Sequence, residues 1–124
     1  MGAYWGVSVL IPALMLLFGW LFLRRPPRRI NSIYGYRTAR SMQNQETWEF
    51  AHRVGGRVWL RTGAVLLAVT LLSALLILGR GERIWKIWCL ILVLLQTAVL
   101  IGTIVPVERA LKENFDDYGR KKER

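Results

Sequence analysis

The run "AYWGVSVLIPALMLLFGWLFL", residues 3–23, contains 21 residues and no charged side chain. As an α-helix it would be about 32 Å long, and the hydrocarbon core of a bilayer is roughly 30 Å thick. The run therefore predicts a membrane-spanning helix. A cleaved signal peptide is the alternative interpretation, but no Lys or Arg precedes the run, and "RRPPRR" follows it directly.

Two further apolar runs are candidate spans. Residues 62–78 number only 17, so they cross a bilayer only if Arg61 and Arg80 extend toward the headgroups or the bilayer thins. Residues 87–105 number 19, and the tryptophans near their start are suited to the membrane interface. The sequence thus predicts an all-α integral membrane protein that forms one domain with three transmembrane helices.

The chain is strongly basic, and its charge is distributed unevenly between the connections. Of its 124 residues 53% are hydrophobic, yet the net charge is +10. Residues 24–61 and the tail, residues 106–124, together carry fifteen Lys and Arg, whereas the loop at residues 79–86 carries three. Because the more basic loops of membrane proteins face the cytoplasm, we expect the tail there and the N-terminus outside. This rule explains the charge without a nucleic-acid partner.

Side chains that could perform catalysis or bind a metal are scarce. Cys89 and His52 are each the single residue of their type, and one Cys with one His on different elements is not a zinc site. The sequence has no glycine-rich phosphate loop and no nucleophile elbow. We therefore expect no enzymatic activity, no metal and no cofactor.

The segment that connects the first two apolar runs, residues 24–61, begins with "RRPPRR". Pro26 and Pro27 favour an extended chain. Each arginine near anionic headgroups contributes about 1 kcal/mol to membrane binding. We therefore expect anionic lipids to be partners of this stretch.

Further along the segment, Ser41 is a residue type that caps the N-terminus of helices. No Gly or Pro occurs between Ser41 and Gly55, so we predict a helix there with Ser41 as its N-cap. Two stripes recur at helical spacing, one largely aromatic and one cationic: Trp48, His52, Gly55 and Trp59, and Arg53, Arg57 and Arg61. Such stripes are typical of an amphipathic helix that lies in the membrane interface. We expect this cytoplasmic interfacial helix to bend at Gly55 and Gly56 before the second span begins.

Nine residues of the connecting segment occur in a particular order: Asn31, Gly35, Arg37, Thr38, Ser41, Trp48, His52, Arg53 and Gly55. This order resembles the signature of the SdpI/YfhL family, N-x-x-x-G-x-R-T, then Ser or Thr, then W-x-x-x-H/N-R and a glycine. The resemblance covers about residues 22–70 by motif and the remaining spans by hydropathy. The namesake of that family protects a toxin-producing bacterium from its own secreted peptide. The resemblance implies a protective protein that binds a membrane-active peptide without catalysis.

The resemblance makes the nine residues candidates for a ligand-binding site, and each has a physical role to test. Gly35 would permit a turn or a close backbone approach. Arg37 could bind a lipid phosphate, a carboxylate or carbonyl groups, or it could pair with Glu46 or Glu49 instead. His52 could titrate near neutral pH or act in packing and hydrogen bonding. The predicted site at the cytoplasmic mouth of the bundle contains Arg37 with Asn31, Thr38, Ser41, Trp48 and His52.

A small transporter or channel is the alternative function. The spans hold few polar residues, with Gln96 and Thr97 near the middle of the third, so a path would have to form between copies of the chain. Two pairs of small residues at a spacing of four could allow close helix packing, either within the chain or in a homo-oligomer: Ala64 with Ala68, and Ala98 with Gly102.

Overall fold

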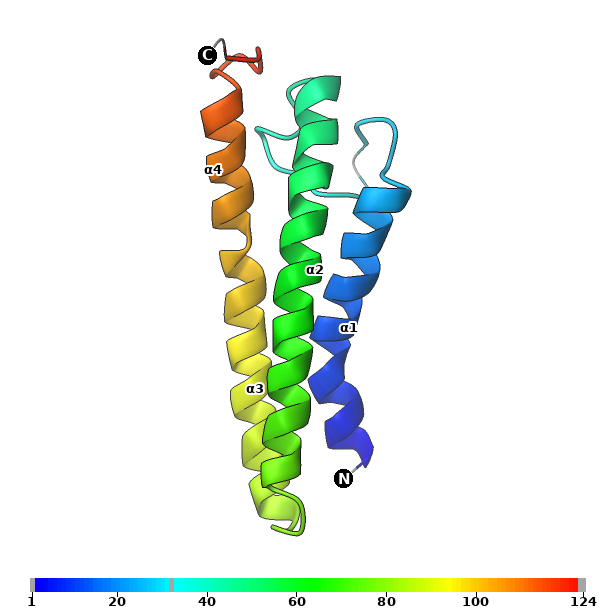
Figure 1. The fold of residues 1–124 in the computed structure, drawn as a ribbon, viewed down its shortest axis with the longest axis vertical. Coiled ribbons are helices and arrows are strands. Elements are labelled where there is room, and N and C mark those ends of the chain that lie inside the picture. Colours follow the sequence, from blue (N-terminus) through cyan, green and yellow to red (C-terminus); the bar gives the residue numbers. More distant parts are fainter. Residues whose placement is uncertain (1, 32, 123–124) are drawn as a thin grey trace.

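The computed structural model describes residues 2–31 and 33–122, which form four helices, one long loop and short connections (Figure 1). The helices are α1 (Gly2–Arg24), α2 (Gln45–Leu76), α3 (Glu82–Gly102) and α4 (Ile104–Asn114). α1 and α2 lie side by side, and α3 continues into α4 as a third rod with a break at Thr103. Ser32 of the connecting segment and residues 123–124 of the predicted tail lie outside the described residues.

Among the described residues, three helical stretches are long and apolar enough to cross a membrane, namely residues 3–24, 45–76 and 82–114. This confirms the prediction of an all-α chain with three candidate spans. The second apolar run is part of a helix of 32 residues. This helix is longer than the hydrocarbon core is thick, although its apolar run has only 17 residues.

The structure has no separate interfacial helix between the first two spans in its described residues. Residues 45–57, which were predicted to form most of it, are instead the first turns of α2. The prediction of Ser41 as the N-cap is wrong, because Asn44 caps α2. The Asn44 side chain accepts a 2.9 Å hydrogen bond from the Thr47 N–H, and the Thr47 hydroxyl accepts one of 3.1 Å from the Asn44 N–H. This reciprocal pair satisfies two donors at the helix start.

α2 passes through Gly55 and Gly56 as one continuous helix without a kink (Figure 1), so the predicted bend at these residues is also wrong. Gly56 and Gly63 serve helix packing instead. A Cβ atom on Gly56 would lie 2.9 Å from the Gly19 carbonyl oxygen, and one on Gly63 would lie 3.1 Å from the Met15 Cβ. Helices that associate in membranes use such small residues to approach closely. The pairs predicted from spacing, Ala64 with Ala68 and Ala98 with Gly102, lie exposed on the outside of the bundle instead.

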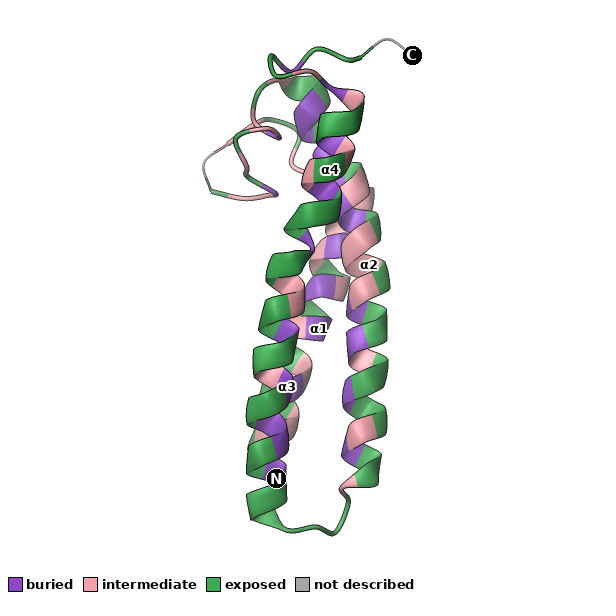
Figure 2. Cartoon of the chain, turned by 90° about the vertical axis from the view of Figure 1, so that its left-hand side faces the viewer, coloured by how far each residue is buried: buried purple, intermediate pink, exposed green. Residues whose placement is uncertain are grey.

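The third rod is linked to α2 by side-chain hydrogen bonds at three heights along the bundle. They join Trp88 to Ser73 at 2.8 Å, Gln96 to Thr70 at 2.9 Å, and Trp59 to Thr103 at 3.0 Å. Buried positions lie on the facing sides of the helices, while the outer sides are exposed (Figure 2). A largely apolar outer surface is what a bundle surrounded by lipid requires.

The residues predicted as a basic tail fold back onto the bundle. α4 packs against α2, and Val107 and Leu111 are buried there. Beyond α4, Phe115 and Lys121 form an antiparallel bridge. We call residues 115–121 the C-terminal hairpin. It contacts the start of α2, where the Asn44 side-chain amide donates a 2.6 Å hydrogen bond to the Gly119 carbonyl oxygen.

Candidate functional site

The loop between α1 and α2 is fixed by hydrogen bonds from its own residues. Asn31 accepts hydrogen bonds from the N–H groups of Ile33 and Tyr34, at 3.0 and 2.7 Å. This is the local turn that Asn side chains favour. On α2, the Trp48 indole donates a 2.6 Å hydrogen bond to the Pro27 carbonyl oxygen. The loop is thus tied to the helix that follows it.

Gly35 brings the loop into contact with the aromatic stripe of α2. Its φ is +116°, a conformation that side-chain-bearing residues rarely adopt. A Cβ atom at this position would lie 2.7 Å from Nε2 of His52 and 3.0 Å from the Trp48 ring. The expectation that Gly35 allows a close backbone approach is confirmed.

His52 is fully buried and is held from both sides. Its Nε2 accepts a 3.0 Å hydrogen bond from the Tyr36 N–H, and its Nδ1 lies 2.7 Å from the Trp48 carbonyl oxygen. A backbone N–H can only donate and a carbonyl can only accept, so these partners assign the proton to Nδ1. The rings of Trp48 and Phe22 pack on the imidazole, with centroids 4.5 and 4.8 Å away. The geometry supports the packing and hydrogen-bonding role for His52.

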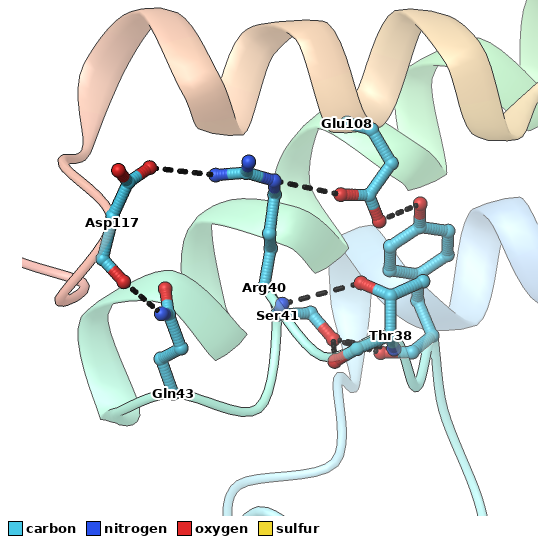
Figure 3. Close-up of polar contacts among 7 residues, drawn as sticks. Thr38, Arg40, Ser41, Gln43, Glu108 and Asp117 are labelled. Carbon is cyan, nitrogen blue, oxygen red and sulfur yellow. Dashed lines mark hydrogen bonds and ion pairs between the residues drawn. The ribbon is translucent and has the colours of Figure 1, made fainter.

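Thr38 and Ser41 form a second, adjacent set of hydrogen bonds (Figure 3). The Thr38 N–H donates to the Ser41 hydroxyl at 2.9 Å, and the Ser41 N–H donates to the Thr38 hydroxyl at 3.2 Å. The Ser41 hydroxyl also donates to the Tyr36 carbonyl oxygen at 2.9 Å. Ser41 is fully buried, so its polar groups stabilise the loop rather than face a ligand.

A contact between the loop and α4 involves residues that the sequence analysis did not single out. The Tyr36 hydroxyl donates a 2.9 Å hydrogen bond to Glu108, and the Arg40 guanidinium lies 3.9 Å from Glu108 and from Asp117 (Figure 3). Burial, with the hydrogen bond to the Glu108 carboxylate, raises the pKa of Tyr36 above its ordinary value. These residues couple the loop to the third rod.

The structure separates the nine signature residues by position. Six of them build the loop and its attachment to α2: Asn31, Gly35, Thr38, Ser41, Trp48 and His52. Gly55 is buried within α2, where an added Cβ atom would lie 3.9 Å from the Val107 side chain of α4. The side chains of Arg37 and Arg53 are exposed. A ligand-binding role for Arg37 stays a prediction, and Arg40 is the loop arginine that forms the ion pairs with α4 and the hairpin.

An aromatic groove opens beside this framework. We use this name for a depression of about 180 Å³ lined by Phe18, Phe22, Ile33, Tyr34, Gly35 and Trp59. The Tyr34 ring lies 6.0 Å from the Phe18 ring and 6.1 Å from the Phe22 ring, measured between centroids. Ile33 is 88% exposed at its edge. Sequence periodicity could not reveal the groove, because it combines α1, the loop and α2.

No group of three or more His, Cys, Asp or Glu side chains that could hold a metal ion occurs among the described residues. The polar side chains of the signature bond mainly to the backbone and to one another. The described residues form three apolar helices of spanning length and a loop that hydrogen bonds hold against α2, which together define a small multi-pass membrane protein.

The sequence model of the SdpI/YfhL protein family matches residues 28–107. The chain is also 37% identical over 99 residues to the uncharacterized protein YfhL of Bacillus subtilis (strain 168), and the alignment covers 80% of each chain. This protein therefore belongs to the SdpI/YfhL family. No solved structure matches it.

Proposed function

We propose that this family member protects its cell by binding a membrane-active peptide, without catalysing a reaction. The observation that supports the proposal is the aromatic groove with Ile33 exposed at its edge. Its volume of about 180 Å³ is below that of pockets for drug-sized ligands, which begin at roughly 300 Å³. The groove therefore suits one large apolar side chain of a peptide, lying against Phe18, Tyr34 and Trp59.

The proposal includes a position in the membrane. The protein lies in the plasma membrane of a bacterium, with the N-terminus outside and the loop and tail cytoplasmic, as the basic residues predict. The groove then meets the peptide at the inner leaflet. The arginines after α1 hold anionic lipids around the same end of the bundle.

Survival of a peptide-sensitive host that lacks other immunity proteins tests the proposal. Cells that express the protein should survive a membrane-permeabilising peptide better than cells without it, and Ile33→Ser should reduce this protection at equal membrane abundance. Tyr118→Ser is the matched control, because Tyr118 is also highly exposed, at 79%, but lies outside the groove. Full protection by Ile33→Ser, or none by the parent against any secreted peptide toxin, would contradict the proposal.

Transport by an oligomer is the second candidate function, and one observation favours it. Ser8, Thr70 and Gln96, from three different helices, form a fully buried polar cluster inside the bundle. Polar groups within spans commonly mark the paths of transported substrates. Ion flux into proteoliposomes that contain the protein would support this candidate, whereas peptide protection without flux would favour the first.

A further inference from the structure

A mixed-charge cleft of about 330 Å³ lies between the first turns of α2 and the C-terminal hairpin. The rings of Phe50 and Phe115 meet edge to face there, with centroids 5.3 Å apart. Glu46, Glu49 and Arg53 line the cleft from α2, and Lys121 lines it from the hairpin. The aromatic groove and the signature residues other than Arg53 take no part in it.

The acidic residues of this cleft are available to a ligand. Both glutamates are exposed, and in the part of the chain that the structure describes neither forms an ion pair with a basic residue. Glu49 accepts a hydrogen bond from the Gln45 side-chain amide, at 3.2 Å. Arg53 stacks over Phe50, with its guanidinium carbon 5.9 Å from the ring centroid. The cleft thus presents carboxylates and cations around an apolar surface.

The charges follow a fixed order along the axis of α2. Arg53 lies four residues, or about 6 Å, closer to the apolar run than Glu49. Arg57 and Arg61 continue the exposed cationic stripe down to the start of that run. The arginines of α2 therefore lie nearest the hydrocarbon, and the carboxylates lie one to two turns farther out. Lys121 lies beside Glu46 at the outer end, where both line a second depression with Asn44.

We propose that the cleft binds the headgroup of an ethanolamine phospholipid. In such a lipid the phosphate is attached next to the glycerol, near the hydrocarbon, and the ammonium forms the free end. Arg53 would bind the phosphate, and Glu49 and Glu46 would bind the ammonium. The two methylene groups of the ethanolamine would lie against Phe50.

This arrangement selects against an anionic glycerol headgroup, which has no ammonium to pair with the two carboxylates. The arginine cluster after α1 provides the contrast. Arg24, Arg25 and Arg28 line a separate depression of about 600 Å³ that has no acidic residue in its lining. We expect anionic lipids to bind at that cluster and the ethanolamine lipid to bind at the mixed-charge cleft.

Native mass spectrometry of the full chain in detergent, with equimolar phosphatidylethanolamine and phosphatidylglycerol, tests the proposal. The parent should retain phosphatidylethanolamine as a bound lipid. The double variant Glu46→Gln/Glu49→Gln should reduce that preference by roughly twofold to thirtyfold, the range for two exposed ion pairs. Arg53→Gln should weaken binding of phosphatidylethanolamine.

Glu82→Gln is the matched control, because Glu82 is an exposed acid at the opposite end of the bundle. It should leave the lipid preference unchanged, and all variants should keep the thermal stability of the parent because the changed side chains are exposed. Equal retention of the two lipids by the parent would overturn the proposal. An unchanged preference in the Glu46→Gln/Glu49→Gln variant would overturn it as well.

Discussion

Gly35 lies so close to His52 that a Cβ atom on the glycine would stand 2.7 Å from Nε2 of the imidazole. Nε2 also accepts the hydrogen bond of the next residue, through the Tyr36 N–H. The loop backbone and the buried histidine are therefore fitted to each other over a separation of sixteen residues. A methyl group in this place would have to displace the ring, the loop or both.

We expect Gly35→Ala to lower the stability of the folded protein by about 2–4 kcal/mol, since it adds backbone strain at φ +116° to a steric overlap with His52. Thermal unfolding in detergent, followed by tryptophan fluorescence, measures the loss. Gly79→Ala is the control, because Gly79 has a φ of +79° and nothing within 4 Å of an added Cβ. If Gly35→Ala and Gly79→Ala lose the same stability, the steric overlap with His52 adds nothing to the loss in Gly35→Ala.

The tautomer of His52 gives a second prediction. Because this is the single histidine of the chain, nitrogen-15 labelling of histidine yields one imidazole signal pair. At neutral pH we expect a neutral ring with its proton on Nδ1, as the bonds to the Trp48 carbonyl oxygen and the Tyr36 N–H require. A proton on Nε2 would contradict this geometry.

Substitution of the same residue separates its polar role from its packing role. His52→Leu leaves the buried Tyr36 N–H without an acceptor, which costs about 1–3 kcal/mol. His52→Gln keeps a side-chain acceptor and should lose less stability. Equal losses for the two variants would mean that ring packing alone stabilises the loop.

Local sequence patterns predicted the spans and the two faces of α2. Apolar runs and helical spacing depend on neighbouring residues, so they were readable without a structure. Trp48 and His52 are buried, whereas Arg53, Arg57 and Arg61 are exposed, as the two stripes indicated. The buried stripe contacts the loop and the other helices, and it belongs to a continuous helix rather than to a separate interfacial one.

The remaining features depend on contacts between distant residues. Ser41 and Asn44 are both suitable N-caps by residue type, and the position of Asn44 is further fixed by its hydrogen bond to Gly119, 75 residues away. The Tyr36 and Glu108 side chains meet over a separation of 72 residues, once α4 packs on α2. No local pattern distinguishes Arg40, which pairs with Glu108, from Arg37.

The hydrogen bond between Tyr36 and Glu108 should stabilise the docking of α4. Tyr36→Phe and Glu108→Gln should each cost about 1–3 kcal/mol, the range for a hydrogen bond to a charged group, and the double variant should cost less than their sum. Thermal unfolding of the parent, the two single variants and the double variant provides a double-mutant cycle. Tyr118→Phe, at an exposed tyrosine, should change nothing. Additive losses would exclude the bond as a source of stability.

The raised pKa of Tyr36 predicts that the stability of the protein depends on pH in the alkaline range. The pKa of Tyr36 is raised in the folded state. The stability that the protonated Tyr36 hydroxyl contributes is therefore fully present below the ordinary tyrosine pKa of 10.0 and is lost as pH rises above it. The parent should therefore lose stability above about pH 10 more steeply than Tyr36→Phe. If the folding stabilities of the two proteins fall equally with pH across that range, the loss comes from other groups.

The distribution of charge predicts the orientation of the protein in the membrane. Fifteen basic residues lie in the first connection and the tail, and three lie in the loop at residues 79–86. A reporter fused after Arg124 should therefore be cytoplasmic, and a tag inserted at Gly81 should be accessible from outside. Gly81 has open space around it, so an insertion there is tolerated. A tag at Gly81 that is protected in intact cells would exclude this orientation.

The buried amide of Gln96 should hold the three spans in register. It donates one 2.9 Å hydrogen bond to the Ser8 carbonyl oxygen of α1 and another to the Thr70 hydroxyl of α2. Hydrogen bonds between membrane helices contribute about 0.6 kcal/mol each, and at most about 1.7 kcal/mol. Gln96→Leu removes both and should lower the stability by about 1–3 kcal/mol. Ser8→Ala is the matched change within the cluster, because the buried Ser8 hydroxyl has no hydrogen-bond partner among the described residues. It should leave stability unchanged or raise it slightly, since an unsatisfied polar group is removed. Unfolding of both variants in the same detergent measures the difference, and a loss for Ser8→Ala as large as that for Gln96→Leu would show that the cluster is held together differently.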